Sequence, residues 1–181
     1  MSVTITAYER VEPVDPALWP RTGAEVDAAY EAGCVRVGAD RVFAQSYRGL
    51  PDLLGGADRI DGGWVKTEGL SLRVGDFSAS GWTGFRRALG ATEYGGEIDR
   101  LGDYLDAYRT RPFFELVYFS DQEGCIGREA CTDLALDFAT RRRAVQPLLR
   151  GDSPFDWHEQ TYGRLAAGFA LAAGTGMVVF A

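Results

Sequence analysis

The stretch Pro112–Phe138, PFFELVYFSDQEGCIGREACTDLALDF, has the clearest pattern in the chain. An apolar run meets a short acidic turn that contains a glycine, and the turn leads into residues with helical spacing. This order predicts a strand, a loop and a helix. The sequence as a whole indicates a soluble globular domain of mixed α and β structure, without a motif that states its activity.

The apolar run Phe113–Ser120 is predicted to be a central strand. Its alternate side chains point to opposite faces, and both sets are mostly apolar. Strands buried on both faces are commonly parallel and covered by helices. The exception is Glu115, because burying an unpaired carboxylate is costly. Its structural interpretation is an ion pair with an arginine, or a strand end that reaches water. Its functional interpretation is a tuned acid or a ligand, and the structural one is favoured because structural ion pairs also perturb carboxylates.

Composition indicates one ordinary domain over residues 1–181, with 46% hydrophobic residues and a net charge of -7. A negative body does not attract nucleic acid or an anionic membrane. The three cysteines lack C-x-x-C spacing, which favours reduced thiols and a cytoplasmic location. The first residues do not resemble a secretory signal. The uncharged tail Leu165–Ala181 is shorter than a membrane span of ~20 residues, so it is predicted to be a buried helix end and a strand.

The remaining elements follow from periodicity and from start and stop signals. Strands are predicted at Val3–Tyr8, at Trp64–Phe77 with an interruption at Gly69, and at Met177–Phe180, with one or two more within Val35–Tyr47. Helices are predicted at Ala24–Ala32, from a cap at Ser80 to Gly90, at Glu97–Arg109, from the acidic turn to Pro147, and after Ser153 and Pro154. If the last two strands were parallel neighbours, the helices between them would form a right-handed crossover.

The helix after the acidic turn has two contrasting sides. Cys131 falls on the apolar side and is predicted to pack in the core. Glu129, Asp133 and Asp137 recur every four residues on the other side. Three carboxylates in this arrangement could chelate a cation, but a solvated face is the favoured interpretation.

The common catalytic motifs are missing from the sequence, including phosphate-binding loops, the G-x-S-x-G elbow and H-E-x-x-H. No cofactor or metal is therefore predicted. His158 is the single histidine and lies on the apolar side of the last helix, so a packing role is favoured over catalysis. Cys125 is predicted to lie in a loop, where it could meet His158, although nothing in the spacing supports that contact.

The acidic turn is the best candidate site by position, because it follows the predicted central strand. Ligands of open α/β sheets gather at the carboxyl ends of strands. Asp121 and Glu123 could bind a hard cation through oxygen, although the turn lacks the spacing of an EF-hand loop. The favoured alternative is a turn whose carboxylates cap exposed backbone amides.

The segment PFFELVYFSDQEGCIG, followed by DLALDF, a closing aromatic helix and the MVVF strand, resembles a family of uncharacterised bacterial proteins. The shared pattern has the form FxxxxFSDxEGxIG, a strand and loop, and covers mainly the C-terminal half. The resemblance implies a common fold. It implies no activity and transfers no catalytic residue.

Together these observations predict an α+β or three-layer α/β fold, with one mixed sheet and about four packed helices. The leading functional prediction is a cytoplasmic binding or protein-interaction module of a bacterium, of accessory or immunity type. Its partner would be another protein or a second copy of the chain, with no nucleic acid and no membrane. The alternative is a small hydrolase-like or cation-dependent enzyme. Its candidate residues are Glu115, Asp121, Glu123 and His158.

Overall fold

The computed structural model describes residues 2–37, 42–43, 63–95, 105–118, 124–149 and 157–181. Their strands form one six-stranded sheet in the order β2-β4-β1-β6-β5-β3. The strands are β1 (Ser2–Pro13), β2 (Cys34–Val37), β3 (Val42–Phe43), β4 (Gly63–Ser78), β5 (Gly124–Gly127) and β6 (Met177–Phe180). Neighbours are antiparallel except β3 and β5, which are parallel. The predicted mixed sheet is therefore confirmed.

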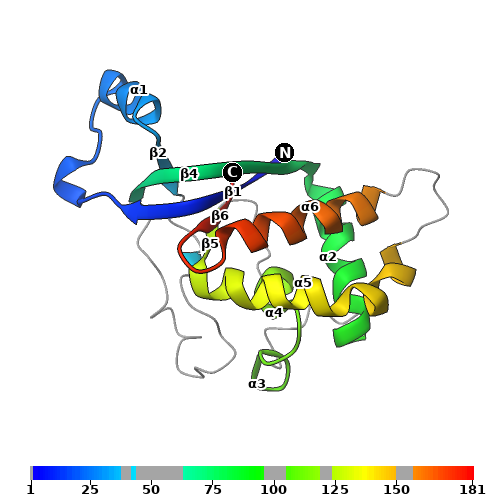
Figure 1. The fold of residues 1–181 in the computed structure, drawn as a ribbon. Coiled ribbons are helices and arrows are strands. Elements are labelled where there is room, and N and C mark those ends of the chain that lie inside the picture. Colours follow the sequence, from blue (N-terminus) through cyan, green and yellow to red (C-terminus); the bar gives the residue numbers. More distant parts are fainter. Residues whose placement is uncertain (1, 38–41, 44–62, 96–104, 119–123, 150–156) are drawn as a thin grey trace.

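The two longest strands, β1 and β4, pair in antiparallel orientation within the sheet (Figure 1). The predicted strand Trp64–Phe77 lies within β4, and the predicted strand Met177–Phe180 coincides with β6. Gly69 does not interrupt β4. It lies where the register shifts, with a φ of +78°, and a Cβ there would collide with the carboxylate of Glu9. A glycine is required at this bulge because it alone adopts positive φ without strain.

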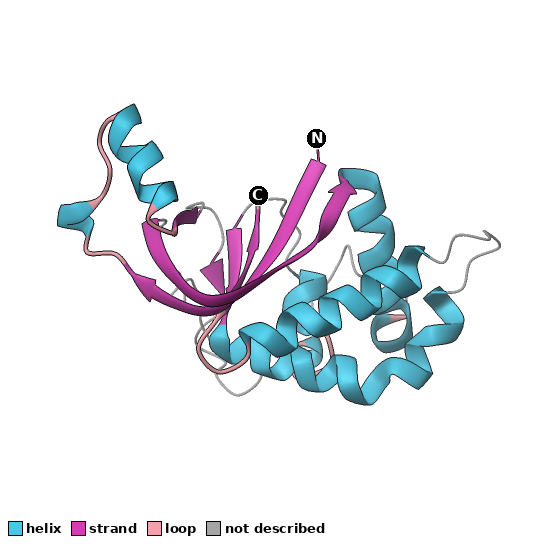
Figure 2. Ribbon diagram, turned by 45° about the horizontal axis from the view of Figure 1, so that its top comes forward, coloured by secondary structure: helices cyan, strands magenta, loops and turns pink. Residues whose placement is uncertain are grey.

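The helices are η1 (Pro16–Leu18), a 3-10 turn, and α1 (Gly23–Glu31), α2 (Ala79–Tyr94), α3 (Leu105–Tyr108), α4 (Phe114–Tyr118), α5 (Arg128–Leu149) and α6 (Trp157–Ala172). Figure 2 shows the larger helices packed on one side of the sheet, which gives two layers and an α+β fold rather than three layers. Every described helix is too short or too polar to cross a membrane.

The main core lies between the sheet and these helices. Alternate residues of β1 (Val3, Ile5 and Ala7) face it, together with Val178 and Phe180 of β6. Four helical aromatic residues fill it from the other side, namely Trp82, Phe85, Phe138 and Phe169. The residues in between point to the opposite face of the sheet. There Val65, Cys125, Met177 and Val179 form a second, smaller buried cluster.

The predicted strand Phe113–Ser120 is wrong, because residues 114–118 form the short helix α4. Phe113, Phe114, Leu116 and Val117 are all fully buried, so α4 is covered on several sides. A short apolar run fits a buried helix as well as a buried strand, and periodicity alone does not separate them. The strand of this region is β5, which lies beside β6 in antiparallel orientation, so no parallel crossover joins them.

Helix ends differ from the predictions by several residues. The α2 helix is capped by Ser78 rather than Ser80, and it ends at Tyr94, with Gly95 as its C-cap, rather than at Gly90. The α5 helix continues two residues past Pro147. Of the predicted helix Glu97–Arg109, residues 97–104 lie outside the described part and 105–108 form α3. The predicted cap of the last helix, at Ser153 and Pro154, also lies outside the described residues.

Candidate functional site

Glu115 lies in α4 rather than in a strand, with an exposed fraction of 0%. Its charge is near the Cys131 thiol of α5. Burial raises the pKa of that thiol well above its usual value, and the charge of Glu115 adds to the increase. The carboxylate therefore belongs to the interior between α4 and α5. A group in this position contacts no substrate without a rearrangement of α4.

The C-terminal end of α4 is held by Arg86 of α2, which is almost fully buried. Its Nε donates to the carbonyl of Leu116 at 3.3 Å, and its Nη2 donates to the carbonyl of Val117. A guanidinium satisfies such terminal carbonyls well, because they have no partner within the helix and carry partial negative charge. Arg86 therefore fixes α4 against α2.

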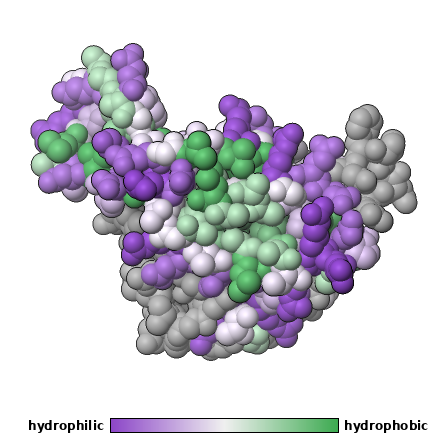
Figure 3. Space-filling view, viewed as in Figure 1, coloured by the Kyte–Doolittle hydropathy of each residue, from purple (hydrophilic) through white to green (hydrophobic). Residues whose placement is uncertain are grey.

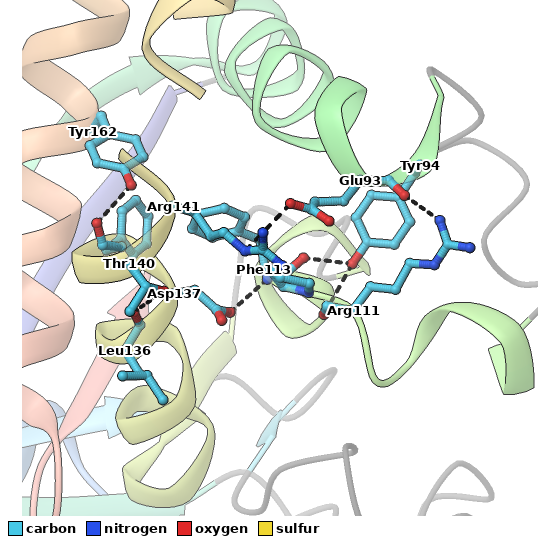
Figure 4. A network of polar contacts seen from close by, with 11 residues as sticks. Glu93, Tyr94, Arg111, Phe113, Leu136, Asp137, Thr140, Arg141 and Tyr162 are labelled. Carbon is cyan, nitrogen blue, oxygen red and sulfur yellow. Dashed lines mark hydrogen bonds and ion pairs between the residues drawn. The ribbon is translucent and has the colours of Figure 1, made fainter. Parts of the chain in front are cut away.

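The N-terminal end of α4 is held by α5 (Figure 4). The backbone amide of Phe113 donates to Oδ2 of Asp137 at 2.7 Å, and Asp137 is only 5% exposed. Phe113 has a φ of +61°, which is rare for a bulky residue. A conformation of this kind costs about 1–3 kcal/mol and persists only where its surroundings hold it. The Asp137 carboxylate supplies that restraint.

A third contact holds the chain just before Phe113. The hydroxyl of Tyr94 donates to the carbonyl of Pro112 at 2.8 Å. Arg111 donates from Nη1 to the carbonyl of Glu93, while the side chain of Glu93 lies 3.7 Å from Nε of Arg141. Figure 4 shows these groups between the end of α2 and the side of α5. Hydrogen bonds from α2 and α5 thus hold residues 111–117 in place, and the polar groups that form them have a structural role.

His158 lies at the start of α6. Its ring is 4.2 Å from the ring of Trp157 and 5.9 Å from that of Phe85. Burial lowers its pKa from 6.5, which favours the neutral imidazole at pH 7. The contacts described for His158 are with α2 and α6, whereas Glu115 lies in α4 beside α5, so they do not bring these two candidates together. Asp121 and Glu123 lie outside the described residues.

The acidic turn differs from the prediction in the elements that flank it along the chain. The segment 119–123 follows helix α4 and precedes strand β5, so it does not come after the carboxyl end of a central strand. The rule that places ligands at that edge of an α/β sheet no longer applies to it.

Cys125 and Cys131 have packing roles. Cys125 lies in β5, not in a loop, and burial raises the pKa of its thiol far above the usual value. Cys131 donates from Sγ to the carbonyl of Ile126 at 3.2 Å and is fully buried, which confirms its predicted place in the core. Thiols held in the protonated form are poor nucleophiles.

The acidic stripe of α5 is not a uniform solvated face. Glu129 is exposed and Asp133 is half-buried, but Asp137 is buried against Phe113. The prediction of a solvated stripe is therefore wrong at Asp137. Among the described residues, no three His, Cys, Asp or Glu side chains are grouped in a way that would hold a metal ion.

One surface feature was not predicted from the sequence, namely the N-terminal arm, which we define as residues 14–33. The arm projects from the end of the sheet (Figure 1), and neither η1 nor α1 contains a buried residue. A capping box between Thr22 and Glu25 begins α1, and the Tyr30 ring lies 5.2 Å from that of Trp64. Figure 3 shows apolar and polar residues interspersed on this arm.

In comparisons with known proteins, no family model, no curated protein and no solved structure matches the chain. The resemblance of the C-terminal half to uncharacterised bacterial proteins therefore stays a prediction.

Proposed function

We propose that the protein is a protein-binding module whose N-terminal arm contacts a partner with a basic surface. The observation that supports this most strongly is that the arm contains two helical elements but buries no side chain of either. A nine-residue helix is marginal in water by itself, because most helical stability in proteins comes from packing of one face. The α1 helix would gain that packing from a partner.

The arm exposes large apolar groups. Leu18 is 74% exposed and Tyr30 is 53% exposed. Tyrosine is enriched in protein interfaces because its ring buries a large area while its hydroxyl accepts a polar contact. Single exposed apolar residues are ordinary, but here they occur on two helical elements in which no residue is fully buried.

The charge of the arm indicates the kind of partner. Residues 14–33 contain four carboxylates, at Asp15, Glu25, Asp27 and Glu31, against the single Arg21, for a formal charge of −3. The whole chain carries -7. Complementary charge speeds encounter and selects among partners, so a surface rich in lysine and arginine fits best.

The alternative, a carboxylate enzyme, gains no support from the described residues, since Glu115 is fully buried and His158 packs against aromatic rings. A cytoplasmic location is part of the proposal and is supported by three free cysteines. An accessory or immunity-type role in a bacterium is also part of the proposal. It rests on the sequence alone.

The test places a photo-crosslinking amino acid at Leu18, at Tyr30 or, as a control, at Leu148 in the full chain in its host cell. Leu148 is an exposed leucine at the far end of α5. We expect crosslinks to one protein from positions 18 and 30 but not from 148, at a basic patch of that protein. Tyr30→Ala should then weaken binding at least tenfold, and Leu148→Ala should not. The absence of crosslinks from the arm, an acidic contact patch, or equal crosslinking from position 148 would refute the proposal.

A further inference from the structure

We propose that the exposed face of α5 is a self-complementary surface through which two copies of this chain associate in antiparallel orientation. We define the α5 face as Glu129, Thr132, Leu136, Thr140 and Arg143, all of which are exposed. This surface is separate from the N-terminal arm. The inference therefore stands or falls independently of the proposed function.

The α5 face is symmetric in sequence about Leu136. Thr132 and Thr140 lie four residues to either side, and Glu129 and Arg143 lie seven residues to either side. Because an α-helix rises 1.5 Å per residue, these pairs lie about 6 Å and about 10 Å from the centre along the helix axis. Four and seven residues are close to one and two turns, so all five side chains share one side of α5.

A two-fold axis beside Leu136 pairs each residue with its counterpart at the opposite end. Leu136 then meets Leu136 of the second copy, Thr132 meets Thr140, and Glu129 meets Arg143. Such an isologous contact uses the same patch on both copies and closes at a dimer. The two ion pairs form at the edges, and the apolar contact lies at the centre.

The charges at the two ends of the face are available for this contact. Within the described part of the chain, neither Glu129 nor Arg143 forms an ion pair, whereas Arg141 pairs with Glu93 of α2 and Arg142 pairs with Glu159 of α6. A uniformly basic or acidic partner would face a like charge at one end. An antiparallel second copy presents an opposite charge at both ends, and this complementarity selects it as the occupant.

The centre of the face suits close helix packing. Leu136 is 61% exposed and points away from the polar cluster in Figure 4. The hydroxyls of Thr132 and Thr140 donate to the carbonyls of Arg128 and Leu136, each at 2.8 Å. Both hydroxyls are thus already satisfied within α5. The threonines can cover a partner helix without leaving an unpaired polar group.

The test measures the mass of the full chain by light scattering and its dimer dissociation by analytical ultracentrifugation. We expect the wild type to form a dimer of twice the 19.7 kDa chain mass. Glu129→Arg or Arg143→Glu alone should weaken the dimer at least tenfold, because like charges then face each other. The double variant, with both substitutions, should restore it. Arg164→Glu, an equivalent charge reversal on the exposed side of α6, is the matched control and should leave the dimer unchanged.

A second measurement reads the register directly. In a Cys34→Ser background, Leu136→Cys should form an intermolecular disulfide under mild oxidation, while Leu148→Cys should not. A wild type that is monomeric at about 100 µM, far above the micromolar affinity of many specific complexes, would overturn the inference. Failure of the double charge swap to restore the dimer would overturn it as well, as would equal crosslinking from position 148. Circular dichroism of each variant confirms that the fold is retained.

Discussion

Replacing Asp137 by alanine tests whether the α5 carboxylate holds the entry into α4. The substitution removes the acceptor that lies 2.7 Å from the amide of Phe113, at a site where both residues are buried. A hydrogen bond to a charged group contributes about 1.5–3 kcal/mol, and a buried amide left without an acceptor costs a similar amount. We therefore expect Asp137→Ala to lower the free energy of unfolding by about 2–3 kcal/mol.

This loss corresponds to a decrease in Tm of about 4–12 °C for a chain of this length. The measurement is urea unfolding followed by tryptophan fluorescence, since Trp82 is buried in the main core. Asp137→Asn keeps an oxygen that can accept from Phe113 and should lose less than half as much. Asp133→Ala, on the same helix but half-buried, should change stability by no more than about 0.5 kcal/mol. If Asp137→Ala matched Asp133→Ala, or if Asp137→Asn were as damaging as the alanine, the proposed restraint would be wrong.

Three further predictions use the same unfolding assay or simple chemistry. A Cβ at Gly176 would collide with the backbone of β1, so Gly176→Ala should lower the free energy of unfolding by at least about 2 kcal/mol. Gly163 is exposed within α6 and has open space around it, so Gly163→Ala should raise the free energy of unfolding by about 0.5–1 kcal/mol. Burial raises the thiol pKa of Cys125 and Cys131, so Ellman's reagent should modify both only as fast as the protein unfolds, and rapid native labelling of either would contradict this. Burial raises the pKa of Tyr162 from 10.0 to about 12, so the stability that the protonated hydroxyl contributes is complete below pH 10 and is lost as the pH rises from 10 toward 12. Tyr162→Phe should remove this part of the pH dependence of stability, and an unchanged profile would refute the prediction.

The sequence by itself determined the elements whose burial differs between two sides. Alternation located β4, whose two faces differ in burial. Helical spacing placed Cys131 in the core for the same reason. The strand β6 was located as a short apolar run, and both of its faces are buried. Local patterns of this kind are set by the nearest layer of packing, so they are visible along the chain.

Tertiary structure alone decided the region from Phe113 to Val117. The residues of α4 are almost all buried, so they show no periodic spacing of apolar and polar side chains. The sequence pattern therefore could not distinguish a helix from a strand in this segment. The same holds for Asp137, whose spacing resembles a solvated stripe although its carboxylate binds an amide 24 residues away. Hydrogen bonds between distant buried groups depend on how helices pack, and local periodicity does not encode that packing. The stretch Pro112–Phe138 therefore contains the short buried helix α4, the strand β5 and the first part of the long helix α5. It does not contain the predicted central strand that would lead to a site.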